Sequence, residues 1–156
     1  MDRFFLFLAA GFGAGYVPIA PGTAGTLVAI PIFLGLSSIP FPLYELTILT
    51  FFFLASWIAG EAQNIWGRRD HPRIVIDEIM GYLITMLWLP KTIFFIMLGF
   101  FLFRFFDIVK PPPIGLMEKA RGGYGVVLDD VVAGVYANIV LQLVRLFIKS
   151  PLSPLY

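Results

Sequence analysis

The sequence predicts an all-α membrane protein, a polytopic bundle of about four to five transmembrane helices after an N-terminal interfacial or re-entrant segment. Of its 156 residues, 59% are hydrophobic and 13% are charged, about half the charged share of a soluble domain. Its mean hydropathy is +0.88. The apolar residues form long runs separated by short polar loops. A chain of this length forms one compact unit, so we expect a single membrane-embedded domain over residues 1–156.

Charge and composition exclude several function classes. The formal net charge is +1, and no basic stripe is present to neutralise a nucleic-acid backbone, so nucleic acid is not an expected partner. The chain has no cysteine, which excludes disulfides, thiolate metal sites and cysteine nucleophiles. Its single histidine, His71, excludes mechanisms that need two.

The apolar runs define the expected elements. Measured against the roughly 20 apolar residues of a full crossing, candidate spans lie at residues 24–40, 42–62, 74–90, 91–109 and 130–149. Residues 3–17 partly resemble a signal peptide, but their positive region is a single Arg3, which favours an interfacial or re-entrant helix. Pro90 and Lys91 predict a tight hairpin, because one continuous helix would bury Lys91 near the bilayer centre.

Positive charges in the loops predict the orientation. Loops 63–73 and 110–129 each hold three lysine or arginine residues, and two candidate spans separate them. Lysine and arginine collect in cytoplasmic loops, so both loops are expected in the cytoplasm and the tail at residues 150–156 outside. This arrangement places every acidic motif on the cytoplasmic face.

Acidic residues stand where apolar runs meet polar loops. A carboxylate at the edge of the hydrocarbon needs a cation, a metal or a water-filled cavity. The five such residues are Asp77, Glu78, Asp107, Asp129 and Asp130. Helix capping or pairing with a neighbouring cation explains a single acid, but three acidic clusters on one face favour a common site. All candidate ligands are oxygen donors, which indicates Mg²⁺ or Mn²⁺ rather than Zn²⁺.

Two of the acidic segments echo each other. Residues 74–81 (IVIDEIMG) and 126–133 (VVLDDVVA) share three aliphatic residues, two acids, two apolar residues and a small one. Each is expected to start a membrane helix with acids in its first turn, where the helix dipole favours negative charge. Gly81 and Ala133 then lie on the acidic face and allow close helix packing.

Two further segments offer groups for an anion. Arg104, Asp107 and Lys110 follow at i, i+3 and i+6. Either Arg104 and Asp107 form a structural ion pair, or Asp107 binds the metal while the two cations bind an anionic substrate. A run of three prolines then ends the helix. Residues 17–26 (VPIAPGTAGT) form a Gly/Thr turn around Thr23 at a helix start, a natural anion site.

Taken together, these motifs resemble the phosphatidylglycerophosphatase A family of bacterial membrane lipid phosphatases. The matching segments are residues 11–15 (GFGAG), 20–26 (APGTAGT), 74–81, 103–114 (FRFFDIVKPPPI) and 122–134 (GGYGVVLDDVVAG). The resemblance implies Mg²⁺-dependent hydrolysis of phosphatidylglycerophosphate to phosphatidylglycerol and inorganic phosphate at the cytoplasmic side of the bacterial inner membrane. Residues 63–73 match least.

The expected mechanism follows from these residues. The four aspartates hold Mg²⁺, and Glu78 is either a further ligand or the base that takes a proton from the attacking water. Arg104, Lys110 and the turn at Thr23 neutralise the developing charge. An aspartyl-phosphate intermediate on one of the paired aspartates at 129–130 is an open alternative.

A small ion-coupled transporter that uses the same acidic cluster is the alternative function. It predicts acids near the bilayer midplane and polar faces that cross the whole membrane. Here the acids gather at one face, and residues 24–40 and 131–141 are almost wholly apolar. A lipid phosphotransferase is less favoured, because the sequence lacks the Asp-Gly…Ala-Arg run followed by two spaced aspartates that is found in the alcohol phosphatidyltransferases.

Overall fold

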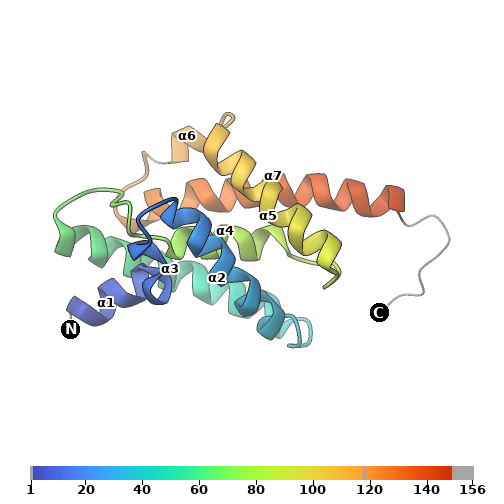
Figure 1. Cartoon of the computed structure of the whole chain (residues 1–156), viewed down its shortest axis with the longest axis horizontal. Coiled ribbons are helices and arrows are strands. Elements are labelled where there is room, and N and C mark those ends of the chain that lie inside the picture. The colour runs from blue at the N-terminus through green and yellow to red at the C-terminus, as the bar shows by residue number, and fades with distance from the viewer. Residues whose placement is uncertain (1, 118, 149–156) are drawn as a thin grey trace.

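The computed structural model describes residues 2–117 and 119–148. Within those residues the protein is all-helical with no strand, as predicted. Helix α7 runs along the longest dimension of the molecule, and α5 crosses it obliquely (Figure 1). The elements are α1 (Asp2–Ala9), the 3-10 helix η1 (Gly11–Tyr16), α2 (Pro21–Leu36), α3 (Leu43–Trp66), α4 (Ile76–Thr85), α5 (Ile93–Val109), α6 (Ile114–Met117) and α7 (Gly123–Ile148).

Helix α4 is the centre of the bundle and corrects the expected span at residues 74–90. It contacts α2, α3, α5 and α7, but it has only 10 residues and ends at Thr85. The chain then reverses through residues 86–92 into α5, because Trp88 adopts a positive φ of 59° and Pro90 cannot continue a helix. The predicted break near Pro90 is confirmed, while a full crossing by this segment is wrong.

Two helices in the described part of the chain, α3 and α7, are long and apolar enough to cross a membrane. This is fewer than the four to five spans expected from the sequence. Helices α2 and α5 have 16 and 17 residues, at or below the shortest length of about 17 that a crossing needs.

The non-helical turn after α4 receives its hydrogen bonds from α7. The amide of Asn138 donates to two carbonyl oxygens within residues 85–88, at 2.9 Å each. Gln142 and Arg145 donate to two carbonyl oxygens of the same segment at 3.2 and 2.6 Å. Irregular backbone inside an apolar bundle needs such partners, so these side chains stabilise the turn in which α4 stops after Thr85.

Helix α7 begins earlier than the expected residue 130. Gly122 has a φ of 62° and forms the turn, whereas Gly123 already belongs to the helix. A side chain at Gly123 would collide with the backbone of Ser56 and Gly60 on α3. The glycine-rich stretch is therefore a helix start pressed against α3. The acids at residues 129–130 lie in the second turn of α7, while those of α4 lie in its first turn, as expected.

The backbones of α4 and α7 touch where the acids lie. A Cβ on Gly134 would collide with the carbonyl oxygen of Gly81, and a Cβ on Gly81 would lie 2.7 Å from the carbonyl oxygen of Asp130. The small residue expected at Gly81 therefore performs the predicted role. On α7, Ala133 is buried, but its neighbour Gly134 makes the contact.

The N-terminal segment packs beside the start of α4. The backbone N–H of Val75 donates to the carbonyl oxygen of Ala9 at 2.9 Å, and the Arg73 guanidinium lies 5.0 Å from the centre of the Tyr16 ring. Helix α1 has 8 residues, too few to cross a bilayer. Its interfacial or re-entrant position stays a prediction.

Candidate active site

Three carboxylates converge where α4 crosses α7. Oxygen atoms of Asp77, Glu78 and Asp130 all lie within 4.8 Å of one another. Asp77 and Asp130 are buried, with exposed fractions of 6% and 3%. The close contact of the two helices at Gly81 and Gly134 brings these side chains together, because it removes the side-chain layer that normally separates packed helices.

Of the two remaining predicted acids, Asp107 joins this group through Arg104, and Asp129 pairs with Lys110 while interacting electrostatically with Asp77 and Asp130. Arg104 Nη1 lies 2.8 Å from an oxygen of Asp107 and 3.8 Å from an oxygen of Glu78. Lys110 Nζ donates to Asp129 at 2.8 Å. The expected Arg104–Asp107 ion pair is therefore present, and Arg104 also contacts the carboxylate group. All five acids expected from the sequence lie in one connected site.

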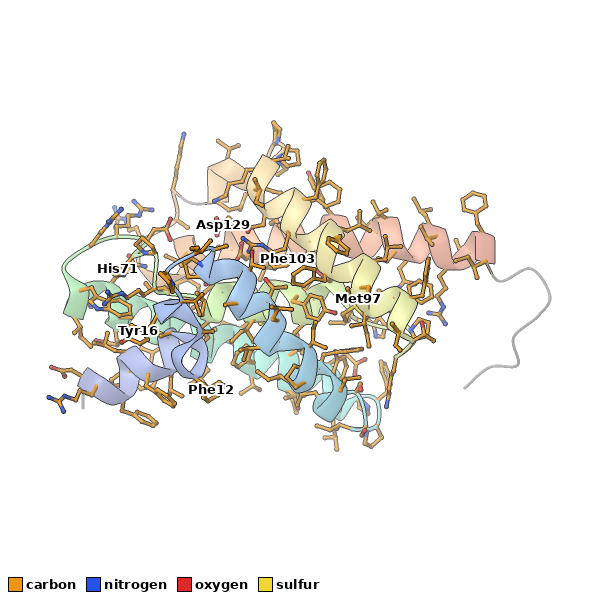
Figure 2. All side chains as sticks on the ribbon, in the orientation of Figure 1. Phe12, Tyr16, His71, Met97, Phe103 and Asp129 are labelled. Atoms are coloured by element: carbon orange, nitrogen blue, oxygen red, sulfur yellow. The ribbon has the colours of Figure 1, made fainter. Side chains whose placement is uncertain are left out.

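The end of α5 places Lys110. The helix stops at Val109, and Lys110 adopts the left-handed conformation with a φ of 46° ahead of the three prolines. This change of direction turns the chain back toward α7, where Lys110 meets Asp129. Figure 2 shows Asp129 nearer the middle of the molecule than His71, which lies in the loop at one end.

The site carries more negative than positive side chains. Asp77 interacts electrostatically with Asp129 and Asp130 as well as with Glu78, and Asp130 also interacts with Asp107. Against five carboxylates stand two cations, Arg104 and Lys110. Buried like charges repel strongly where little water screens them, so the group calls for a further cation or for bound protons.

The donor set fits a hard divalent cation. Glu78 Oε2 is buried and has no hydrogen-bond partner within the described residues, so this oxygen has ligand capacity to spare. Mg²⁺ takes one or two carboxylates and completes its octahedron with water and phosphate oxygens. Asp77, Glu78 and Asp130 would hold such an ion, with Asp107 and the equally buried Asp129 beside them.

The first turn of α2, the Gly/Thr turn singled out in the sequence, forms one wall of the site. A Cβ on Gly22 would collide with Glu78 Oε1 and lie 3.1 Å from both terminal nitrogens of Arg104. Thr26 donates its hydroxyl to the Gly22 carbonyl at 2.9 Å. Thr23, the predicted phosphate ligand, is next to Gly22 in this turn.

Asp70 and His71 lie in a loop apart from this group. His71 stacks on Trp66 with 4.4 Å between ring centres, and its Nδ1 accepts from the backbone N–H of Arg73 at 3.2 Å. Partial desolvation, followed by the nearby charges of Arg73 and Arg68, lowers the pKa of His71. Asp70 is exposed. These contacts give His71 a structural role in its loop.

Comparison with known proteins decides the family. The sequence model of Phosphatidylglycerophosphatase A matches residues 7–145. The chain belongs to this family. All the residues of the acidic site lie within the matched segment, as do Gly22, Arg104 and Lys110.

Phosphatidylglycerophosphatase A of Escherichia coli K12 is 37% identical over 88% of this chain and 81% of its own length. The Haemophilus influenzae enzyme of the same name is also 37% identical, over 86% and 84%. A Bacteroides thetaiotaomicron protein provisionally named a phosphatidylinositol-3-phosphatase is 40% identical over 88% and 91%. No solved structure matches the chain.

Membership of the phosphatidylglycerophosphatase A family makes this protein a phosphatase. The transporter alternative is therefore wrong as an account of its activity. The apolar helices α3 and α7, together with relatives that are named for membrane lipids, indicate an association with the membrane.

Proposed function

We propose that this protein hydrolyses the terminal phosphate of phosphatidylglycerophosphate, with Mg²⁺ bound at the acidic site, to give phosphatidylglycerol and inorganic phosphate. The observation that carries the proposal is the group of three carboxylates within 4.8 Å of one another, beside an arginine that contacts one of them. Oxygen ligands and an arginine are the groups that proteins use to hold a transferring phosphoryl group.

The first turn of α2 and Arg104 form the phosphate-binding side of the site. The first N–H groups of a helix lack intrahelical acceptors and attract anions, and those of Gly22 and Thr23 belong to this turn. Gly22 has no side chain to fill the space beside Glu78 and Arg104. We therefore assign the phosphate to the backbone of this turn, with the Thr23 hydroxyl and Lys110 as further donors.

Hydrolysis breaks the bond between phosphorus and the glycerol oxygen and forms one between phosphorus and a water oxygen. A divalent cation, when bound, supplies positive charge for the phosphate oxygens and makes water a better nucleophile. Glu78 either helps to hold the ion or accepts the proton of the attacking water through its unpartnered Oε2. Arg104 neutralises charge that develops on the phosphoryl oxygens. The released glycerol oxygen takes a proton from water.

An aspartyl-phosphate route remains the second mechanism, with Asp129 or Asp130 as the nucleophile. Asp129 is hydrogen bonded to Lys110, whereas Asp130 belongs to the central carboxylate group. Acid quenching during turnover distinguishes the routes, because a phosphoprotein is trapped only if the aspartate attacks.

The proposed location is the bacterial inner membrane, with several crossings and the acidic site facing the cytoplasm. Helices α3 and α7 support the crossings. The lysine and arginine residues of loops 63–73 and 110–122 support the orientation, because such residues collect on the cytoplasmic side. Membrane phospholipids are then both substrate and surroundings.

Phosphorylated phosphatidylinositol is the second candidate substrate. The relative that favours it is the Bacteroides thetaiotaomicron protein, at 40% identity. Both lipids present a phosphate monoester on a polyol head group, so the same acidic site serves either one.

The test is phosphate release by the purified protein in detergent from each of the two lipids, with Mg²⁺ and with excess EDTA. We expect release with Mg²⁺, none with EDTA, recovery with Mn²⁺ and no recovery with Zn²⁺, because the site offers only oxygen ligands. Undiminished release in EDTA would refute the metal, and no release from either lipid by folded protein would refute the proposed function.

A further inference from the structure

A cavity that is open to the surface lies at the same end of α7 as the acidic site. It has a volume of about 440 Å³ and lies between the C-terminal half of α3 and the start of α7. Gly123 lines it, seven residues before Asp130. Seven residues make two turns of helix, so the two lie on one face of α7, about 10 Å apart.

The lining of this cavity has unused capacity for a polar ligand. The side-chain nitrogen of Gln63 is buried and has no acceptor in the described part of the chain. Glu61 and Arg121 also line the cavity, and neither forms an ion pair with any described residue. A buried donor without a partner is costly, which indicates that a ligand or water fills its place.

Two aromatic residues that line the cavity indicate at which level of the membrane it lies. Trp57 and Tyr124 line it with exposed fractions of 56% and 46%. Exposed tryptophan and tyrosine residues gather at the level of lipid head groups, where an apolar ring meets water. The cavity therefore faces the layer in which a phospholipid carries its polyol and its phosphodiester.

We propose that this cavity binds the part of the substrate head group that is not hydrolysed, an inference that rests on the proposed function. Arg121 binds the bridging phosphodiester, because a guanidinium matches the geometry of phosphate oxygens. Glu61 accepts hydrogen bonds from hydroxyl groups of the polyol and Gln63 donates to them, which suits a ligand whose groups do both. One lipid would thus present its terminal phosphate to the carboxylates and its bridging phosphodiester to the cavity.

The cavity would then select the lipid while the acidic site performs the chemistry. A head group without a polyol and a second phosphate, such as that of phosphatidic acid, leaves Arg121, Glu61 and Gln63 without ligands. The expected substrate class is therefore phosphate monoesters of polyol phospholipids.

The first arm of the test is kinetic and uses the full chain in detergent. Arg121→Ala and Glu61→Gln are expected to raise KM for phosphatidylglycerophosphate by roughly tenfold, the value of one charged hydrogen bond. Their kcat should stay within about threefold, because the lost contacts are made equally in the ground and transition states. Arg68→Ala and Asp70→Asn remove an exposed arginine and an exposed acid of the neighbouring loop, neither of which lines the cavity, and should leave KM unchanged.

The second arm measures binding without turnover. Short-chain phosphatidylglycerol, which has no terminal phosphate, is titrated in EDTA while tryptophan fluorescence is followed, since Trp57 lines the cavity. We expect saturable binding that weakens roughly tenfold in Arg121→Ala and Glu61→Gln, and much weaker binding of short-chain phosphatidic acid.

The two arms separate the failures. If the wild-type protein releases no phosphate but binds phosphatidylglycerol through Arg121 and Glu61, the proposed activity is wrong and the cavity assignment stands. If phosphate is released normally while both variants keep wild-type KM and binding, the cavity assignment is wrong. Weaker phosphatidylglycerol binding with unchanged KM would assign the cavity to a second lipid and also overturn the proposal.

Discussion

The two ends of α4 both bring polar groups into an apolar bundle, but they differ in whether those groups have hydrogen-bond partners. At its C-terminal end, the carbonyl oxygens of residues 85–88 receive hydrogen bonds from Asn138, Gln142 and Arg145 of α7. At its N-terminal end, Asp77 and Glu78 face a third carboxylate, and Glu78 Oε2 has no partner among the described residues. A structural polar cluster is satisfied within the protein, whereas a functional one keeps capacity for something else.

The largest effect should come from the functional end. Asp130→Asn removes a charge from the central carboxylate group and is expected to lower phosphate release about a thousandfold or more. Thermal stability should not fall, because the substitution relieves repulsion among buried carboxylates. Phosphate release and the melting temperature check both statements. The control Asp70→Asn changes an exposed acid outside the group, and near-normal turnover by Asp130→Asn would break the comparison.

A smaller loss of activity is expected when Lys110, beside the three central carboxylates, is replaced. Lys110→Gln removes the ion pair with Asp129 and should lower kcat/KM by about 10- to 100-fold, the usual effect of losing a group that orients a ligand. Lys119→Gln, at an exposed lysine of the next loop, serves as the matched control. Equal kinetics in the two variants would show that Lys110 has no part in the site.

The wall formed by α2 allows a sharper test with two glycines of one helix. A Cβ on Gly22 collides with Glu78, while a Cβ on Gly35 meets nothing within 4 Å. Gly22→Ala should therefore lower kcat/KM by about tenfold through a displaced Glu78, and Gly35→Ala should leave activity unchanged. A Gly22→Ala variant as active as Gly35→Ala would exclude this turn from the site.

The smallest effect on activity should come from the C-terminal end of α4, where side chains of α7 donate hydrogen bonds to the carbonyl oxygens. Asn138→Ala removes a donor from the Thr85 carbonyl oxygen and leaves the Leu87 oxygen with Gln142 as its side-chain donor, so it should reduce the free energy of unfolding by about 1–3 kcal/mol. Activity per folded molecule should stay within about twofold. Denaturant unfolding and phosphate release measure the two quantities. Gln142→Ala, which removes one bond, should destabilise less; unchanged stability in Asn138→Ala would contradict the structural role.

The residues of the functional end could be predicted from the sequence because charges stand out in an apolar run. The acids, Arg104 and Lys110 were all identified that way, and the structure brings them into one site. The turn around Thr23 was identified as an anion site, and the structure brings the Gly22 backbone of that turn against Glu78 and Arg104. A glycine that matters through its missing side chain leaves no chemical signal of its own.

The early end of α4 at Thr85 was not predicted, for a different reason. The apolar sequence continues past Thr85 to Leu89, so nothing local reports that α4 stops after 10 residues. The signal lay in α7, where Asn138, Gln142 and Arg145 follow at i, i+4 and i+7 on one helix face. Only the packing of α7 against α4 reveals that these side chains donate hydrogen bonds to the carbonyl oxygens at the end of α4.

The short length of α4 bears on how the protein meets its substrate. Ten residues of helix rise about 15 Å, roughly half of the bilayer's hydrocarbon thickness. The carboxylates at one end of α4 and the turn at the other therefore fit within a single leaflet. Under the proposed function, a phospholipid at this site would keep its acyl chains among its neighbours while its phosphate is removed. Turnover then follows the surface density of substrate, and diluting the lipid with inert detergent at constant bulk concentration should slow the enzyme.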